Sequence, residues 1–182
     1  MSDRSTVRYT YQDYLSIPED SSRRHEIVDG ELFVTPAPRL RHQQVVGRLL
    51  RILMDLTEED EQGEVVPGPV TVRLHEEGVV EPDLIFVAAE RLRIVNPDEG
   101  VDGPPDLVVE VLSPSNREFD RKVKRKHYME HGVPELWIVD ADEGTVEVWR
   151  PGAVRPRVVR HTLEWKVADR SFEIPLSDVF PR

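Results

Sequence analysis

Apolar and polar positions recur along the chain with two different periods, and each period predicts one kind of element. Between residues 39 and 56 the apolar side chains fall at 45, 46, 49, 50, 53 and 56. This helical spacing, kept over several turns, predicts a helix packed against the core. A shorter helix is expected to begin after Thr10, a residue type that caps helices, and to stop near Pro18. The segment HEIVDGELFVTP predicts a β-hairpin, because its Asp29-Gly30 pair tolerates the positive φ angles of a type I′ turn.

The second half of the chain predicts a strand, a helix and another strand in succession. The run 107–112 is almost continuously apolar, which is typical of a strand buried on both faces. A helix is expected next, capped by Ser115 with Glu118 three residues later and ended by Gly132. The run ELWIVD then predicts a strand parallel to the first, joined to it by a right-handed crossover. Further strands are predicted in EVVPGPVTVRL, where two prolines indicate an edge or a bulge, and in EPDLIFV, TVEVWR and the tail from residue 155; RLRIVNPDEGVDGPP is expected to be a loop.

This order of elements predicts an α/β (α+β) fold, in which helices flank a mixed β-sheet. With 182 residues, we expect a single domain that covers residues 1–182. The chain has no cysteine, no apolar signal-peptide core at its N-terminus and no apolar run long enough to span a bilayer. We therefore expect a cytoplasmic protein.

The charges of the chain are unevenly distributed. The net charge of -11 argues against a protein that coats nucleic acid by bulk electrostatics, because such domains are usually basic. Two local patches differ from this average: residues 117–131 carry six basic and three acidic side chains, and residues 39–56 carry four arginines against Asp55 alone. Both patches could meet phosphates, although solvated helix faces produce the same pattern.

A glutamate interrupts the most apolar run of the chain. Glu110 lies where a buried strand normally carries another valine, and a buried carboxylate is costly unless a positive group meets it. Side chains alternate along strands, so Glu110 and Asp83 point into one pocket if their two predicted strands are neighbours. Paired carboxylates are typical ligands of Mg²⁺ or Mn²⁺. The alternatives for Glu110 are a buried salt bridge, for example with Lys124 on the helix that follows, and a glutamate at a strand end that reaches solvent.

Four segments resemble, in order and spacing, the Uma-type family of restriction-endonuclease-like proteins, which belongs to the PD-(D/E)xK nuclease superfamily. They are HEIVDGELFVTPAPRLRHQQVVGRLL, VEPDLIFV, GPPDLVVEVLSPSNREFDRKVKRKHYMEHGVPELWIVD and VEVWR, within roughly residues 8 to 150. The resemblance implies a restriction-endonuclease-like fold and a metal-dependent endonuclease that cuts DNA. It implies that Asp83 and Glu110 are the metal-binding acids, and a homodimer is expected by the same analogy.

One position departs from the superfamily pattern. The usual lysine two residues after the acid is replaced by Leu112. Members of the Uma-type family carry this lysine on the next helix. The resemblance therefore implies that Lys124 is the catalytic lysine. Lys122 and Lys126 remain as substitutes.

Further matched residues extend the expected site. Glu26 is expected as a third metal carboxylate, with an exposed hairpin residue as the alternative. His42, Arg121 and Tyr128 are expected to contact the substrate; for His42 the alternative is a histidine at the core edge that bonds a backbone carbonyl. The remaining histidines, at 25, 75, 127, 131 and 161, were matched to no zinc-binding pattern, and no zinc site is expected.

Two other functions compete with a DNA endonuclease. One is a catalytically inactive nuclease-fold module that binds nucleic acid or a protein partner, which the acidic net charge favours. The other is a Mg²⁺-dependent phosphohydrolase of small nucleotides, but the chain lacks a glycine-rich phosphate loop.

Overall fold

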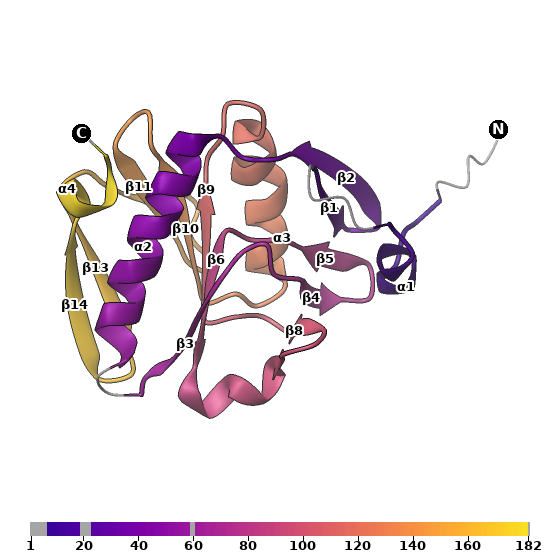
Figure 1. Ribbon diagram of the computed structural model, residues 1–182, viewed down its shortest axis with the longest axis horizontal. Helices are drawn as coiled ribbons and strands as arrows, with labels where there is room; N and C mark the ends of the chain where they lie inside the picture. The colour runs from indigo at the N-terminus through magenta and orange to yellow at the C-terminus, as the bar shows by residue number, and fades with distance from the viewer. Residues whose placement is uncertain (1–6, 19–22, 59–60, 182) are drawn as a thin grey trace.

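A six-stranded mixed sheet, here called the central sheet, forms the middle of the molecule (Figure 1). The computed structural model describes residues 7–18, 23–58 and 61–181. The strands of the central sheet lie in the order β12 (Arg157–Val159), β11 (Thr145–Trp149), β10 (Glu135–Asp140), β9 (Leu107–Val111), β6 (Leu84–Ala88) and β3 (Gly63–Pro67). The β9–β10 pair is parallel, and the other neighbouring pairs are antiparallel. The sheet is therefore mixed, as predicted.

Short strands near the N-terminus form a second sheet. Its order is β2 (Glu31–Pro36), β1 (Arg23–Val28), β5 (Gly78–Val80), β4 (Val72–His75), β8 (Gly100–Asp102) and β7 (Val95–Asn96). The predicted hairpin is the β1–β2 pair, and Asp29 and Gly30 at its turn have φ angles of 49° and 79°. These are the positive values that a type I′ turn requires. A separate hairpin, β13 (Thr162–Val167) with β14 (Arg170–Pro175), completes the strands near the C-terminus.

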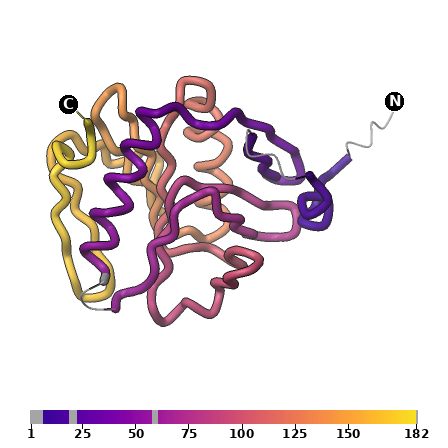
Figure 2. Tube along the Cα trace, in the orientation of Figure 1, coloured from indigo at the N-terminus to yellow at the C-terminus, as the bar shows by residue number. Residues whose placement is uncertain are grey.

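The helices cover both faces of the central sheet. They are α1 (Tyr11–Leu15), α2 (Leu40–Glu58), η1 (Ala89–Ile94), η2 (Phe119–Lys124), α3 (Arg125–Glu130) and α4 (Leu176–Val179). On one face, α2 and the β13–β14 hairpin lie side by side (Figure 2), and Leu49 of α2 belongs to one apolar cluster with Phe86 and Trp165. On the other face, Tyr128 of α3 packs with Val108 of the central sheet and with the second sheet. None of the described helices is both long enough and apolar enough to cross a membrane.

The strand–helix–strand unit 107–140 is present as predicted, but its helix differs in detail. Ser115 lies in a turn, with its hydroxyl 3.1 Å from that of Ser113, and Glu118 pairs with Lys122. The predicted capping box is therefore wrong. The segment η2 is a π-helix, a wider turn that α3 continues in α-helical geometry. Gly132, with a φ angle of 86°, follows the helix end as expected.

Two other segments differ from the prediction. EVVPGPVTVRL is not one interrupted strand, because its two halves enter different sheets: β3 lies at the edge of the central sheet, and β4 pairs in the second. Pro67 ends the first half, consistent with the inability of proline to donate in a sheet interior. The expected loop 91–105 contains part of η1 and the short strands β7 and β8, whose two and three residues are too few to show a period.

Candidate functional site

Two acids from neighbouring antiparallel strands face each other at the end of the β6–β9 pair. The antiparallel register pairs Leu84 with Val109, so Asp83, just before β6, and Glu110, just after Val109, lie opposite each other on one face. Each is 2% exposed. Both line a cavity of about 20 Å³, which is room for one or two water-sized species. The predicted placement of these two acids on one face of adjacent strands is confirmed.

Asp83 is held by three donors. Its Oδ1 accepts from Arg24 Nη1 at 2.6 Å, and its Oδ2 lies 3.0 Å from His42 Nε2 and accepts from the Val111 backbone N–H at 2.8 Å. Burial alone would raise the pKa of Asp83, but His42, Arg24 and this N–H outweigh burial and lower it below its ordinary value. Asp83 is therefore a fixed carboxylate at neutral pH.

Glu110 shares a buried lysine with Glu26. Lys124 Nζ lies 2.6 Å from Glu110 Oε1 and 2.7 Å from Glu26 Oε1, and Tyr128 donates its hydroxyl proton to Glu110 Oε1 at 2.6 Å. The Glu81 backbone N–H also donates to Glu26 Oε1, at 2.9 Å. Within the described residues, the hydrogen bonds and ion pairs of both glutamates thus end on Oε1.

The protonation of these groups depends on burial and on their mutual charges. Burial raises the pKa of Glu110 to about 7, and Asp83 and Glu26 act in the same direction, against Lys124. Burial also raises the pKa of Asp120, which lines the same cavity, well above its ordinary value. Burial would lower the pKa of the Lys124 ammonium, but Glu110 and Glu26 raise it instead. Lys124 therefore stays protonated at neutral pH, whereas Glu110 is close to its midpoint.

The acid pocket, as we call the cavity lined by these groups, has an excess of negative charge. Its four carboxyl groups face two permanent cations, which leaves 4 − 2 = 2 negative charges when all four are ionised. The carboxyl groups belong to Glu26, Asp83, Glu110 and Asp120, and the cations to Arg24 and Lys124. Carboxylate oxygens are the ligands that Mg²⁺ and Mn²⁺ prefer. The donor set and the charge both fit one divalent cation.

The helix after β9 selects one lysine for this pocket. Lys124, at the end of the π-helix, is 2% exposed and points at the acids. Lys122 pairs with Glu118 on the surface, and Lys126 Nζ lies 3.7 Å from Glu130 Oε2. Successive residues of a helix are rotated by about 100°, so these three lysines cannot face one pocket. The prediction that Lys124, rather than either neighbour, approaches Glu110 is confirmed.

The family model described as "Uma2: Putative restriction endonuclease" matches residues 11–177, which is most of the chain. The chain belongs to the Uma2 family. A solved structure described as "a putative nuclease belonging to DUF820" from Anabaena variabilis superposes with a TM-score of 0.78, covering 94% of this chain and 97% of the other at 19% identity. At this identity the likeness shows the fold. An uncharacterised protein of Synechocystis, sll1609, is 28% identical over 133 residues, which are 72% of this chain and 73% of that protein.

The remaining predicted residues of this Uma2 protein have different placements. Glu26 is buried against Lys124, so the alternative of an exposed hairpin residue is wrong. His42 lines the pocket and contacts the Asp83 carboxylate, not a backbone carbonyl. Tyr128 is fully buried behind Glu110 and therefore positions that acid instead of meeting a substrate.

Arg121 is not brought to the acid pocket. Its guanidinium lies 3.0 Å from Asp140 Oδ2 and 2.8 Å from Glu147 Oε1, both on strands of the central sheet. These two ion pairs hold its guanidinium against the strands, and Arg121 does not line the acid pocket. The structure therefore offers no support for Arg121 as a substrate contact.

Two residues of the Uma2 pocket were missed from the sequence. Arg24 precedes Glu26 by two residues on β1, so strand alternation alone places both on one face. Asp120 precedes Lys124 by four residues, about one helical turn, and this spacing predicts that both side chains share a face.

The expectation of no zinc-type spacing in this Uma2 protein is also wrong. His127 and His131 are four residues apart, one turn along a helix, and they lie beside His75 and Asp29. The His-x-x-x-His spacing is present in the sequence, and it predicts two imidazoles on one helix face.

Proposed function

We propose that this protein is a metal-dependent endodeoxyribonuclease that hydrolyses phosphodiester bonds at the acid pocket. The observation that carries the proposal is the buried pair Asp83 and Glu110, opposed on neighbouring strands with Lys124 beside them. Membership of a family described as restriction endonucleases supports a nuclease in general. DNA as substrate and Mg²⁺ or Mn²⁺ as cofactor are the finer parts of the proposal.

Asp83, Glu110 and Glu26 would hold the divalent ion, because they supply oxygen ligands on one side of the cavity. A bound divalent ion supplies Lewis-acid polarisation of the scissile phosphate. His42 and Arg24 keep Asp83 ionised and in place, and Tyr128 orients Glu110 through its hydroxyl.

Lys124 acts as a donor in this proposal. Since its pKa is raised, its ammonium keeps its proton at neutral pH and cannot serve as a general base. It would donate hydrogen bonds to a non-bridging phosphate oxygen and offset the charge that develops in the transition state. Glu26, 2.7 Å from Lys124 Nζ, helps to hold the ammonium in position.

An inactive nuclease-fold module is the second candidate, and the net charge of -11 favours it. In that case the Lys124–Glu110 pair is a structural salt bridge. A cytoplasmic homodimer, expected from the family analogy, is part of the main proposal, since two sites allow both strands of a duplex to be cut.

The test is plasmid nicking with Mg²⁺ or with chelator, on the wild type and Glu110→Gln. The matched control is Glu173→Gln, another strand glutamate between buried neighbours, which is exposed and lies in the β13–β14 hairpin. We expect nicking only with Mg²⁺, and a loss of at least about 100-fold in Glu110→Gln, because metal polarisation is worth several kcal/mol. The control should cut like the wild type.

Nicking that persists in chelator, or that survives Glu110→Gln, contradicts the proposal. A wild type that binds DNA without cutting it under any divalent ion supports the inactive module instead.

A further inference from the structure

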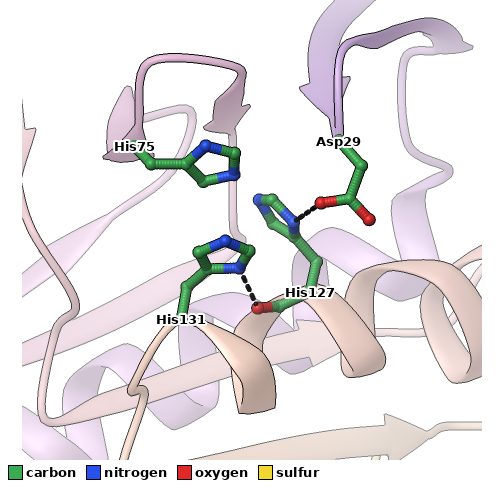
Figure 3. Close-up of side chains that lie close together, drawn as sticks. All are labelled: Asp29, His75, His127 and His131. Atoms are coloured by element: carbon green, nitrogen blue, oxygen red, sulfur yellow. Dashed lines mark hydrogen bonds and ion pairs between the residues drawn. The ribbon is translucent and has the colours of Figure 1, made fainter.

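Three histidines and an aspartate gather at the C-terminal end of the helix formed by η2 and α3 (Figure 3). Asp29 comes from the β1–β2 turn, His75 from the end of β4, and His127 and His131 from α3 and its C-cap. One ligand atom of each residue lies within 4.8 Å of the others. We call this group the histidine cluster. It joins three segments that are far apart in the sequence.

Hydrogen bonds orient two of these rings as metal-binding histidines are commonly oriented. His127 Nδ1 donates to Asp29 Oδ1 at 3.1 Å, and His131 Nδ1 donates to the His127 carbonyl oxygen at 2.9 Å. A proton on Nδ1 leaves the lone pair on Nε2, and histidine ligands of metals usually have such a carboxylate or carbonyl partner. Figure 3 shows the second nitrogen of each of these rings turned toward the space beside His75.

Buried nitrogens without a partner mark the same space. Nε2 of His127 and Nε2 of His75 are inaccessible to solvent and have no hydrogen-bond partner among the described residues. A buried polar atom that lacks a partner costs about 1–3 kcal/mol. Coordination of a cation would remove this cost at both atoms.

We propose that the histidine cluster is a second metal site, which binds a Zn²⁺-class transition ion through His75, His127 and His131. Asp29 is the positioning residue that fixes the His127 ring. Three imidazole nitrogens favour Zn²⁺ or its neighbours Co²⁺ and Ni²⁺, whereas Mg²⁺ prefers oxygen ligands. The two sites of this chain would therefore take different ions.

The three histidine rings are close enough to bind one ion, but one ring must rotate before all three can point at it. His75 and His131 are stacked, with centroids 4.1 Å apart and planes at 10°, whereas His127 is tilted by 49° and 47° to them. Imidazole lone pairs lie in the ring plane, so two stacked rings cannot point at one ion. His75 is the last residue of β4, and its Nδ1 accepts a long hydrogen bond, 3.3 Å from the Glu77 backbone nitrogen. We infer that this ring turns when the ion binds.

Gly78 leaves the room that this arrangement needs. A Cβ at this position would lie 2.4 Å from His75 Nε2 and 2.7 Å from His127 Cε1.

The test measures zinc binding on metal-stripped full-length protein by metal content and melting temperature. ZnCl₂ is added to the wild type and to His75→Gln, His131→Gln and Asp29→Asn. His161→Gln is the matched control, because His161 is exposed and outside the cluster. We expect one Zn²⁺ per chain and a raised melting temperature in the wild type and control. Both ligand variants should lose this response, and Asp29→Asn should bind about 10- to 100-fold more weakly.

Glu110→Gln separates this inference from the proposed nuclease site. It removes an acid of the acid pocket, so it should abolish the response to Mg²⁺ and leave the response to Zn²⁺ intact. Co²⁺ added in place of Zn²⁺ should give visible absorption bands that disappear in His131→Gln.

Three outcomes overturn the inference. The first is that metal-stripped protein binds no Zn²⁺. The second is that Zn²⁺ binding persists in both ligand variants, and the third is that it is lost in Glu110→Gln, which would place the ion in the acid pocket. Far-UV circular dichroism confirms that each variant is folded before it is scored.

Discussion

At the scale of single residues, the acid pocket places a carboxyl group near its midpoint at neutral pH. Burial raises the pKa of Glu110 from 4.5 to about 7, while the neighbouring Asp83 has a pKa lowered by its three donors. Opposite shifts in two adjacent acids assign them different roles. At neutral pH Asp83 is ionised, and Glu110 can meet a cation as a carboxylate only after it loses its proton.

We therefore expect the response to Mg²⁺ to increase with pH. A folded pKa above the unfolded value contributes stability that is complete below about pH 4.5 and is lost as the pH rises through about 7. Mg²⁺ competes with that proton, so the Mg²⁺-induced rise in melting temperature should be larger at pH 8 than at pH 6. Scanning fluorimetry with Mg²⁺ and with chelator measures it. An equal rise at both pH values, or one retained in Glu110→Gln, would contradict this assignment.

The main residues of the pocket could be predicted because they follow local periods. Asp83 precedes one short apolar strand and Glu110 interrupts another, and the alternation of side chains along a strand fixes the face of each acid. Arg24 could have been found by the same argument. The pairing of His42 with Asp83 could not, because it joins residues 41 positions apart through tertiary packing alone. Whether the whole of residues 1–182 is one domain stays a prediction.

At the scale of elements, the helix after β9 is attached to the central sheet through a buried charge. Lys124 is the cation of this attachment, and Arg125 N–H bonds the Asp120 carbonyl, the five-residue step of a π-helix. An apolar pattern with a 3.6-residue period predicts that a helix exists here but not this wider turn. The sequence therefore predicts the helix but not the π-helical segment that ends at Lys124.

Removal of this buried cation should destabilise the protein far more than removal of an exposed one. Lys124→Met leaves Glu110 and Glu26 without their shared partner, and such a loss costs about 3–5 kcal/mol. Lys122→Met, which breaks the exposed pair with Glu118, should stay within about 1 kcal/mol. Urea unfolding in the presence of chelator measures the free energy of unfolding of both variants. Similar losses in the two variants would mean that the Lys124 pairs contribute no more than surface pairs.

At the scale of the whole molecule, many of the basic side chains that could meet phosphates are already engaged. Arg41 and Arg48 donate to backbone carbonyls, and Arg117 and Arg121 pair with Asp140. These contacts remove part of both basic patches. A chain of net charge -11 therefore offers few free cations to the phosphates of a nucleic acid.

We expect DNA binding that depends weakly on monovalent salt and strongly on the divalent ion. With few phosphate contacts, the slope of log K against log salt should be about 3 or less in magnitude, because each contact contributes about 0.9. In chelator, binding should fall below detection, since four carboxyl groups line the acid pocket without a divalent ion. Fluorescence anisotropy on a labelled duplex measures both. A steep salt dependence with tight binding in chelator would indicate a basic surface elsewhere.

The helix formed by η2 and α3 carries side chains of both sites along its length. Lys124 and Tyr128 reach the acids, and the adjacent His127 reaches the histidine cluster. If both ions bind, their affinities are thermodynamically linked through this one helix. Whatever factor Zn²⁺ applies to the affinity for Mg²⁺, Mg²⁺ must apply to the affinity for Zn²⁺. If Zn²⁺ shifts the helix so that Mg²⁺ binds more tightly, then bound Mg²⁺ tightens Zn²⁺ binding by the same factor.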